Sequence, residues 1–343
     1  VNGTLHDGNY TVVVSNDFGS VTSTPTALQV DGTPSAHTVA SIGMEMIFCP
    51  PGTFTMGSPT SEAGHGNDET QHQVTLTNGF YLGKYEVTQA QYQTVMNGNS
   101  AGLSADPSKF KGSNRPVESV SWNDAQVFLS RLNTMEQTAG RLPTGWKYVL
   151  PTEAQWEYAC RGGTTTAYSW GNDINSSLAN YGGNIGQTVN VGQYGANPWG
   201  LHDMHGNVLE WVNDRYVDAY SIGPVVNPSG PALGDRVVQR GGHWGHTSGL
   251  PRSAYRGNNP KTHRATTKGF RLAFHASPAD TANPELELFG GAAITLEAGQ
   301  AWAEPGVEAH DARDGNITDQ IVVTGTVDMN STGTYLLTYT VQD

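Results

Sequence analysis

The chain has few cysteines, few charged residues and no long apolar run. Only two cysteines, Cys49 and Cys160, occur among its 343 residues, which excludes a framework of several disulfides. Both lie in runs typical of core elements, and we interpret them as small core residues; a single disulfide between them is the alternative. No stretch of about 18 apolar residues occurs, which predicts no membrane insertion within this fragment.

Basic residues are also scarce, and they form no cluster. The chain has 18 Lys and Arg against 31 Asp and Glu, which gives a formal net charge of −13. Such a chain repels nucleic acid and anionic lipid, so neither is expected as a partner. The acidity suits divalent cations, which prefer oxygen ligands, although solubility alone also accounts for it.

The residues that are abundant indicate a loop-rich globular protein with aromatic anchors. The sequence contains 42 Gly, 18 Pro, 14 Tyr and 8 Trp, and its length suits two or three domains. It has no signal peptide, and Val1 is not a natural start. We therefore expect a fragment of a longer polypeptide whose signal sequence lies outside it.

Changes of pattern along the chain predict five segments. Near the start, apolar and polar residues alternate as in two strands joined by a turn at residues 16–19. The expected segments are strands at 1–30, a linker at 31–39, a main domain at 40–276, a linker at 277–284, and strands at 285–343 that stop before the domain is complete.

Three helices are predicted in the main domain. Each follows a Ser or Thr that can cap its first turn: residues 89–96, residues 122–137 and a short helix after Thr152. Apolar residues of 122–137 recur on one helical stripe, which indicates a face packed on the core. The short third helix is expected to end at Gly162.

Six blocks of the main domain carry a family resemblance. They read PPGTFTMGS (50–58), YLGKYEVTQ (81–89), RPVESVSWNDA (115–125), LPTEAQWEYACRGG (150–163), WGLHDMHGNVLEW (199–211) and GFRLA (269–273). In this order they resemble the formylglycine-generating enzyme family, also called the sulfatase-modifying factor family. The resemblance implies an α+β fold, the sulfatase-modifying-factor variant of the C-type lectin fold.

The two ends of the chain resemble bacterial immunoglobulin-like modules. The N-terminal end reads GNYTVVVSNDFG at residues 8–19, and the C-terminal end includes DGNIT at 314–318 and GTYLLTYTV at 333–341. The resemblance implies all-β immunoglobulin-like segments at both ends. It also implies an extracellular or bacterial cell-surface location.

The block at residues 199–211 concentrates oxygen ligands. Asp203 and Glu210 flank a Gly-Asn turn, and calcium takes about six to eight oxygens, which loops supply well. The alternative is that the two carboxylates only cap and salt-bridge the loop. The resemblance implies one calcium ion held by the side chains of Asp203 and Glu210 and the carbonyls of Gly206 and Val208, and a second ion held by Asn180 and Asn184.

The redox residues of the family are missing. Its oxidase carries two cysteines just after an Arg-Gly-Gly segment, and they hold Cu(I). Here Arg240-Gly-Gly242 is followed by no cysteine. Soft thiolates suit Cu(I), so neither copper nor oxidation by the family mechanism is expected. A metal cluster of His243 and His246 with His202 or His205 is an alternative to histidines that are exposed or satisfied within the fold.

Residues 243–268 are polar and lack a strong strand pattern, and we interpret them as the exposed, ligand-facing loop. For Arg252, as for Arg256 and Arg271, a structural role that ties loops to carboxylates is also expected. The candidate contact residues are His243, Trp244, His246, Ser248, Arg252, Tyr255, Asn258, Asn259 and His263.

The sequence therefore favours a non-catalytic extracellular module for binding or structure, on a calcium-stabilised scaffold. Its expected partner is a protein or glycan ligand, or neighbouring copies of the same chain. Two alternatives stay open. One is an oxidoreductase of the formylglycine-generating or iron sulfoxide synthase type, and the other is a ligand-binding receptor diversified by a retroelement at residues 243–268.

Overall fold

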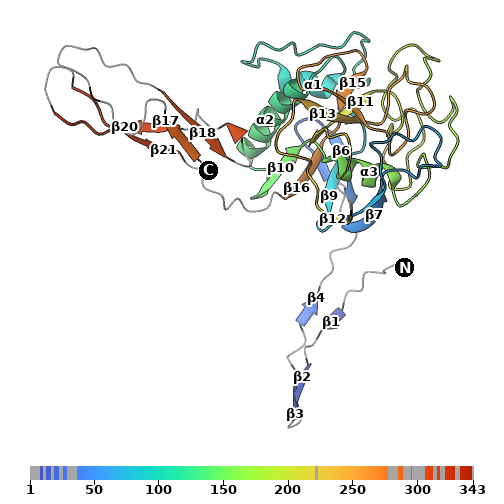
Figure 1. Ribbon diagram of the computed structural model, residues 1–343, viewed down its shortest axis with the longest axis horizontal. Helices are drawn as coiled ribbons and strands as arrows, with labels where there is room; N and C mark the ends of the chain where they lie inside the picture. Colours follow the sequence, from blue (N-terminus) through green and yellow to red (C-terminus); the bar gives the residue numbers. More distant parts are fainter. Residues whose placement is uncertain are drawn as a thin grey trace. The chain divides into compact units, whose positions relative to one another are not determined.

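The computed structural model describes residues 37–220 and 223–276, the backbone of short strands near the N-terminus, and parts of residues 285–341 (Figure 1). The chain divides into two compact units, Val1–Ala276 and Ser277–Asp343.

Strands of residues 37–276 form a five-stranded antiparallel sheet in the order β10-β16-β9-β6-β5, a four-stranded sheet β14-β13-β11-β15 and a three-stranded sheet β12-β8-β7. The pairs β11–β15 and β8–β12 are parallel. The strands are β5 (His37–Val39), β6 (Met44–Cys49), β7 (Gly52–Met56), β8 (His72–Leu76), β9 (Phe80–Gly83), β10 (Trp146–Val149), β11 (Leu209–Arg215), β12 (Val225–Val226), β13 (Arg236–Arg240), β14 (Gly257–Pro260), β15 (Lys268–Phe270) and β16 (Ala273–Ala276).

The predicted helices are confirmed as α1 (Gln89–Met96), α2 (Trp122–Thr138) and α3 (Glu153–Arg161), each opened by a capping box. Helix α2 packs against α1 and β10, and α3 packs against β7, β11 and β13. Each helix in the described part of the chain is too short or too polar to span a bilayer.

Two apolar clusters form the core of the main domain. One joins α1 and α2 to the five-stranded sheet, and the other surrounds α3. Cys49 and Cys160 both lie in the second cluster, where they are buried and free. Their interpretation as core residues is confirmed, and the alternative disulfide does not form. Trp156 and Trp211 are fully buried, and each indole N–H finds an acceptor.

At the N-terminal end, β2 (Val13–Asn16) pairs with β3 (Gly19–Thr22) around the predicted turn. A second pair joins β1 (Gly8–Tyr10) to β4 (Thr26–Leu28). The side chains of these strands lie outside the described residues. Residues 37–39, which the sequence placed in a linker, form β5 instead, because they pair with Met44–Met46 of β6.

The C-terminal unit contains two described groups of strands, all of them antiparallel. These strands agree with the predicted β pattern of residues 285–343. They are β17 (Glu285–Leu288), β18 (Val307–Asp311) and β19 (Gly315–Asn316) in one sheet, and β20 (Val322–Thr324) and β21 (Thr338–Thr340) in the other.

Candidate functional site

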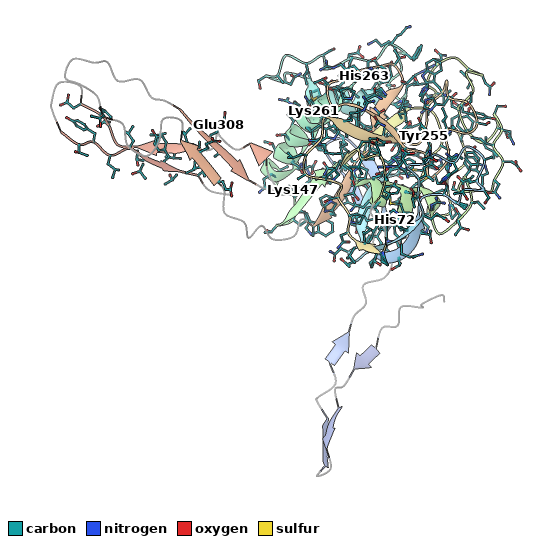
Figure 2. All side chains as sticks on the ribbon, in the orientation of Figure 1. His72, Lys147, Tyr255, Lys261, His263 and Glu308 are labelled. Atoms are coloured by element: carbon teal, nitrogen blue, oxygen red, sulfur yellow. The ribbon has the colours of Figure 1, made fainter. Side chains whose placement is uncertain are left out.

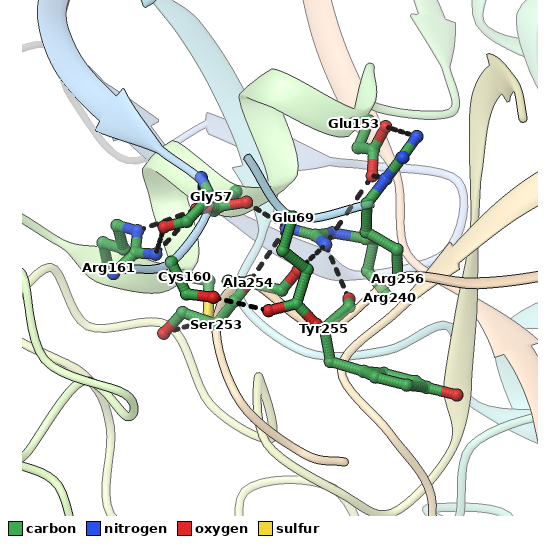
Figure 3. A network of polar contacts seen from close by, with 12 residues as sticks. Gly57, Glu69, Glu153, Cys160, Arg161, Arg240, Ser253, Ala254, Tyr255 and Arg256 are labelled. Carbon is green, nitrogen blue, oxygen red and sulfur yellow. Dashed lines mark hydrogen bonds and ion pairs between the residues drawn. The ribbon is translucent and has the colours of Figure 1, made fainter. Parts of the chain in front are cut away.

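Residues 241–256 form the loop between β13 and β14, and hydrogen bonds from Arg240 hold this loop in place (Figure 3). This guanidinium is fully buried. Its Nη1 donates to the carbonyl oxygens of Ala254 and Tyr255 at 2.8 and 2.6 Å. Its Nη2 donates to the carbonyl of Ser253 at 2.8 Å and to the Glu157 carboxylate of α3. Three consecutive loop carbonyls are thereby held in place by one side chain.

Arg252 is not part of the exposed surface, which corrects that prediction. Its side chain is 1% exposed, and it pairs with Glu62 at 2.6 Å and Glu69 at 2.8 Å. Its Nε donates to the carbonyl of Gly249 at 2.7 Å. A buried guanidinium requires such pairing, and its donors are occupied inside the fold. The expected structural role is the one that the structure shows.

Arg256 has the same kind of role. It forms two hydrogen bonds with the Glu153 carboxylate, at 2.8 Å from Nε and 3.0 Å from Nη2. Its guanidinium lies over the rings of Tyr220 and Tyr216, 4.1 and 4.8 Å from their centroids. The N–H donors of this buried guanidinium are therefore paired with a carboxylate, and its planar face is covered by aromatic rings.

The loop held by these arginines carries side chains that are partly exposed, among them His243, His246 and Tyr255. The two imidazole centroids are 3.6 Å apart, and the ring of Tyr255 lies 5.7 Å from that of His246. Ser248 and His263 are exposed. Figure 2 labels His263 near the top of the main domain, with Tyr255 below it and His72 lower still.

Trp244, Asn258 and Asn259 are partly buried at the edge of this surface. The Trp244 indole donates to the carbonyl of Thr266 at 3.2 Å, and its ring meets Phe110 edge-on at 5.7 Å. Asn258 and Asn259 belong to β14. We name the surface formed by His243, Trp244, His246, Ser248, Tyr255, Asn258, Asn259 and His263 the loop face.

Both imidazoles of this adjacent pair are held neutral. Burial, with additional repulsion from the neighbouring His246 and Lys268, lowers the pKa of His243 to about 3. Burial and Lys268 lower the pKa of His246 to about 4. Its Nδ1 is buried without a hydrogen-bond partner among the described residues. Sequence reasoning missed Lys268, because a lone Lys at the start of a strand gives no signal that it is buried.

The predicted alternative of a histidine metal cluster does not form in the described part of the chain, where no group of three or more His, Cys, Asp or Glu side chains is placed to hold a metal. His202 Nδ1 lies 2.8 Å from the carbonyl oxygen of Tyr194. His205 is buried, with Nδ1 2.7 Å from the Pro251 carbonyl and Nε2 3.6 Å from Cys160 Sγ. Each of these histidines is satisfied within the fold.

Glu210, one of the predicted calcium ligands, is engaged by other side chains. Its two carboxylate oxygens accept from Nε and Nη2 of Arg271, each at 2.6 Å. Oε2 also accepts the Trp156 indole N–H at 2.6 Å. The carboxylate is buried, and its charge is balanced by a guanidinium. The salt bridge offered as the alternative is therefore the arrangement that Glu210 has.

Asp203 differs from Glu210. Its backbone is left-handed, with φ of 56°, a conformation for which Asp is favoured among non-Gly residues. Oδ2 accepts the Gly192 N–H at 2.6 Å, while Oδ1 is buried without a partner among the described residues. Burial raises its pKa to about 6, which Gly192 and Arg271 partly offset.

The other predicted ligands lie around the same turn, apart from Asn184. A Cβ at Gly206 would lie 2.3 Å from the Asn180 carbonyl oxygen, so only Gly fits there. Asn180 is buried, and its Oδ1 has no partner among the described residues. The Val208 N–H donates to Glu86 Oε1 at 3.1 Å. Asn184 is exposed.

Glu86 is a member of this cluster that sequence reasoning missed. It is fully buried and accepts from the Asn207 side chain at 2.6 Å. Burial, together with Asp203 and Glu210, raises its pKa well above the usual range. Glu86 lies in a separate sequence block, so only the packing of β9 and its following turn against residues 203–210 reveals it.

Neither thiol is prepared for metal or redox chemistry. Burial raises the pKa of Cys160 to about 12, and it raises that of Cys49 further. Both side chains are therefore neutral thiols at physiological pH, whereas the thiolate is the reactive and metal-binding form.

These features define a mixed α/β scaffold that displays a polar loop face above a buried Arg–Glu network. Residues 32–276 match the sulfatase-modifying factor enzyme 1-like domain, and residues 286–343 match the bacterial surface protein Ig-like domain. The chain belongs to the sulfatase-modifying factor enzyme 1-like family, and its C-terminal module is of a kind found in bacterial surface proteins. The N-terminal immunoglobulin-like segment stays a prediction.

Named relatives agree with this assignment. The chain is 29% identical to the formylglycine-generating enzyme of Mus musculus over 302 residues, which covers 69% of this chain and 77% of that protein. PvdO from Pseudomonas aeruginosa is similar in structure, with 28% identity, a TM-score of 0.63, and coverage of 70% of this chain and 97% of that one. Treponema denticola variable protein 1 is also similar in structure, with 27% identity, a TM-score of 0.59, and coverage of 70% of this chain and 99% of that one.

Proposed function

We propose that this chain is a non-catalytic binding or structural module of a bacterial cell-surface protein, and that it contacts its partner through the loop face. The partner is a protein or glycan ligand, or a neighbouring copy of the chain. The match to a bacterial surface Ig-like domain at residues 286–343 supports the location.

The observation that carries this proposal is the contrast between an intact frame and missing thiols. The arginines that hold residues 241–256 are buried and paired, and a binding surface needs support of this kind from fixed side chains beneath it. No cysteine follows Gly242 in this chain, and both existing thiols are buried. The buried arginines therefore support the loop face, and the chain lacks the cysteines that would hold copper for the family's oxidation reaction.

One structural neighbour favours a second candidate function. Treponema denticola variable protein 1 covers 70% of this chain at 27% identity, and its name describes a variable protein. The second candidate is accordingly a receptor diversified at residues 243–268. Copies of the gene that differ mainly in codons for exposed residues of this range would support it, and copies that differ evenly along the chain would contradict it.

Calcium as a stabilising ion is a further part of the proposal. Asp203 Oδ1 and Asn180 Oδ1 are buried oxygens without partners among the described residues, a costly state that a bound cation relieves. They fit calcium, whereas Glu210 does not, because Arg271 and Trp156 occupy it. We propose that Asp203, with the carbonyls of Gly206 and Val208, binds one ion and that Asn180 serves the second.

The proposed function is tested by two assays on the purified chain. Incubated with copper, oxygen and a sulfatase-type cysteine peptide, it is expected to leave the cysteine unoxidised, with no aldehyde trapped by a hydrazide probe. On arrays of glycans and surface proteins, the chain is expected to bind a ligand that is lost in the double variant His243→Ala and His246→Ala.

The matched control for binding is Gln73→Ala. Gln73 is exposed and belongs to β8, where its side-chain amide donates to Thr55 of β7 at 2.8 Å and to no residue of the loop face. The control is expected to bind as the unchanged chain does. Aldehyde formation, or equal binding by the double variant, would show that the proposal is wrong.

A further inference from the structure

Lys268, the first residue of β15, is a buried cation without a carboxylate partner. It is 4% exposed, and its Nζ donates to Gln239 Oε1 at 2.8 Å. No carboxylate of the described residues pairs with it, and burial is the resolved cause that lowers its pKa to about 8. Its Nζ also lies 5.7 Å from the centroid of the Trp211 ring, a cation–π contact, but only one of the three donors of this ammonium group has an oxygen acceptor among the described residues.

The other buried cations of the main domain show how unusual this is. Each pairs with a buried carboxylate, and they are Arg161, Arg240, Arg252, Arg256 and Arg271. A buried charge that lacks such a partner is costly to maintain. Lys268 therefore lies where an anion from outside the chain would replace the missing partner.

Further hydrogen-bonding groups beside Lys268 are unused. Gln239 Oε1 accepts from Lys268 Nζ at 2.8 Å and from Asn259 Nδ2 at 3.0 Å, and two donors on one oxygen fix the orientation of this amide. Gln239 Nε2 is consequently a donor, and it is buried without a partner among the described residues. Its N–H groups therefore have no acceptor among the described residues, and a carboxylate placed against them would supply one.

The two imidazoles extend this set of donors toward solvent. His243 Nδ1 accepts the Gly245 N–H at 3.0 Å, so the proton of the neutral ring is on Nε2, which becomes a donor. His246 Nδ1 is a second buried nitrogen without a partner among the described residues. The segment that carries both rings lies against the start of β15, because the Trp244 indole donates to the carbonyl of Thr266, two residues before Lys268, at 3.2 Å.

The sign of the local charge decides the class of ligand. Both imidazoles are neutral, so the ammonium of Lys268 sets the local charge, and a positive charge disfavours a metal cation. The same arrangement attracts a carboxylate, which accepts several hydrogen bonds at once. The rim of the loop face is made of hydroxyl and amide groups, at Ser248, Tyr255 and Asn258, which suits sugar hydroxyls.

We propose that the loop face binds an acidic sugar of the uronic acid type, whose carboxylate docks on Lys268, Gln239 Nε2 and the imidazoles of His243 and His246. This inference rests on the proposed function, because it assigns a ligand class to the same surface. One buried cation among neutral polar groups matches one carboxylate among hydroxyls, and it does not match an acidic peptide with several charges.

The experiment is calorimetric titration of the full chain with glucuronate, its neutral methyl ester and an oligo-aspartate peptide. Glucuronate is expected to bind at least tenfold more tightly than the ester and the peptide. Lys268→Met is expected to weaken glucuronate binding at least tenfold while remaining folded, since removing a buried unpaired charge does not destabilise a core. Lys268→Arg is expected to retain part of the affinity.

Lys261→Met is the matched control, because Lys261 is exposed on the neighbouring turn, and it is expected to bind glucuronate normally. Equal affinity for glucuronate and its ester, or unchanged binding by Lys268→Met, overturns this inference. Tighter binding of the peptide overturns the sugar class. If a neutral glycan binds and His243→Ala with His246→Ala abolishes that binding, the proposed function stands and only the acidic-sugar inference fails.

Discussion

Arg271 faces three buried carboxylates, those of Glu86, Asp203 and Glu210. Its guanidinium is fully buried and also donates to the carbonyls of Gly83 and His202 at 3.0 and 2.9 Å. One side chain therefore neutralises part of an acidic cluster and ties β9 to the loop before β11. Without it, the carboxylates face one another in a medium of low polarity.

Arg271→Met is expected to lower the free energy of unfolding by about 3–5 kcal/mol, the usual cost of breaking a buried ion pair. The loss is expected to be smaller at pH 5 than at pH 8. Asp203 has a raised pKa, about 6, so its stabilising contribution is present below its unfolded pKa and is lost as pH rises through 6; removing the cation increases this effect. Urea denaturation at both pH values measures it.

Lys84→Met is the comparison for Arg271→Met. Lys84 pairs with Glu45 at 2.7 Å, but the Glu45 side chain is 56% exposed, and exposed pairs contribute only about 0–1 kcal/mol. Equal losses in the two variants would contradict a special role for Arg271.

Helix α3 supplies the carboxylates that pair with Arg240 and Arg256, two of the arginines that hold residues 241–256 in place. Its first turn is capped by Thr152, whose Oγ1 accepts the Gln155 N–H at 3.1 Å while Gln155 Oε1 accepts the Thr152 N–H at 2.9 Å. Gly162 ends the helix with φ of 53°, where a left-handed backbone favours Gly. Between these ends, Glu157 pairs with Arg240 and Glu153 pairs with Arg256.

Thr152→Ala is expected to cost about 1 kcal/mol, the usual value of an N-cap side chain, because the Gln155 N–H loses its acceptor. The denaturation midpoint at constant m-value measures this loss. Thr134→Ala in α2 is the control: its side chain is exposed and bonds only to the Ser130 carbonyl, so we expect a change within about 0.5 kcal/mol. A cost for Thr152→Ala as small as that of the control would contradict the cap.

For the molecule as a whole, the proposed calcium binding at the buried acidic cluster predicts a stability that depends on bound cations. The chain carries a formal net charge of −13, and Asp203 adds a buried oxygen without a partner among the described residues. A ligand that binds only the folded state raises stability with its concentration. Calcium is the ion that suits these oxygens.

Calcium at about 100 times its Kd is expected to add about 2.7 kcal/mol and to raise Tm by about 5–10 °C, as measured by scanning calorimetry with and without a chelator. Asp203→Asn is expected to abolish this shift. Asp106→Asn, at an ion pair whose Asp side chain is 52% exposed, is expected to retain it. A chelator that leaves Tm of the unchanged chain where it was would refute calcium binding.

Local signals made much of the scaffold predictable. The caps of α1, α2 and α3 and the apolar stripe of α2 are read within one or two helical turns, and all three helices form as predicted. The hairpin of β2 and β3 forms around its predicted turn for the same reason. The six blocks identified the family because each is a short run of consecutive residues that keeps a local part of the family scaffold.

The sequence by itself determined the family, the helices and the lack of thiols at the copper position. Only the tertiary structure decided which charges are buried and paired. Arg252 looked like a surface residue until Glu62 and Glu69 were seen to enclose it, and Lys268 gave no signal at all. Burial and ion pairing join residues far apart in the chain, so their free energies are set by packing and not by any local pattern.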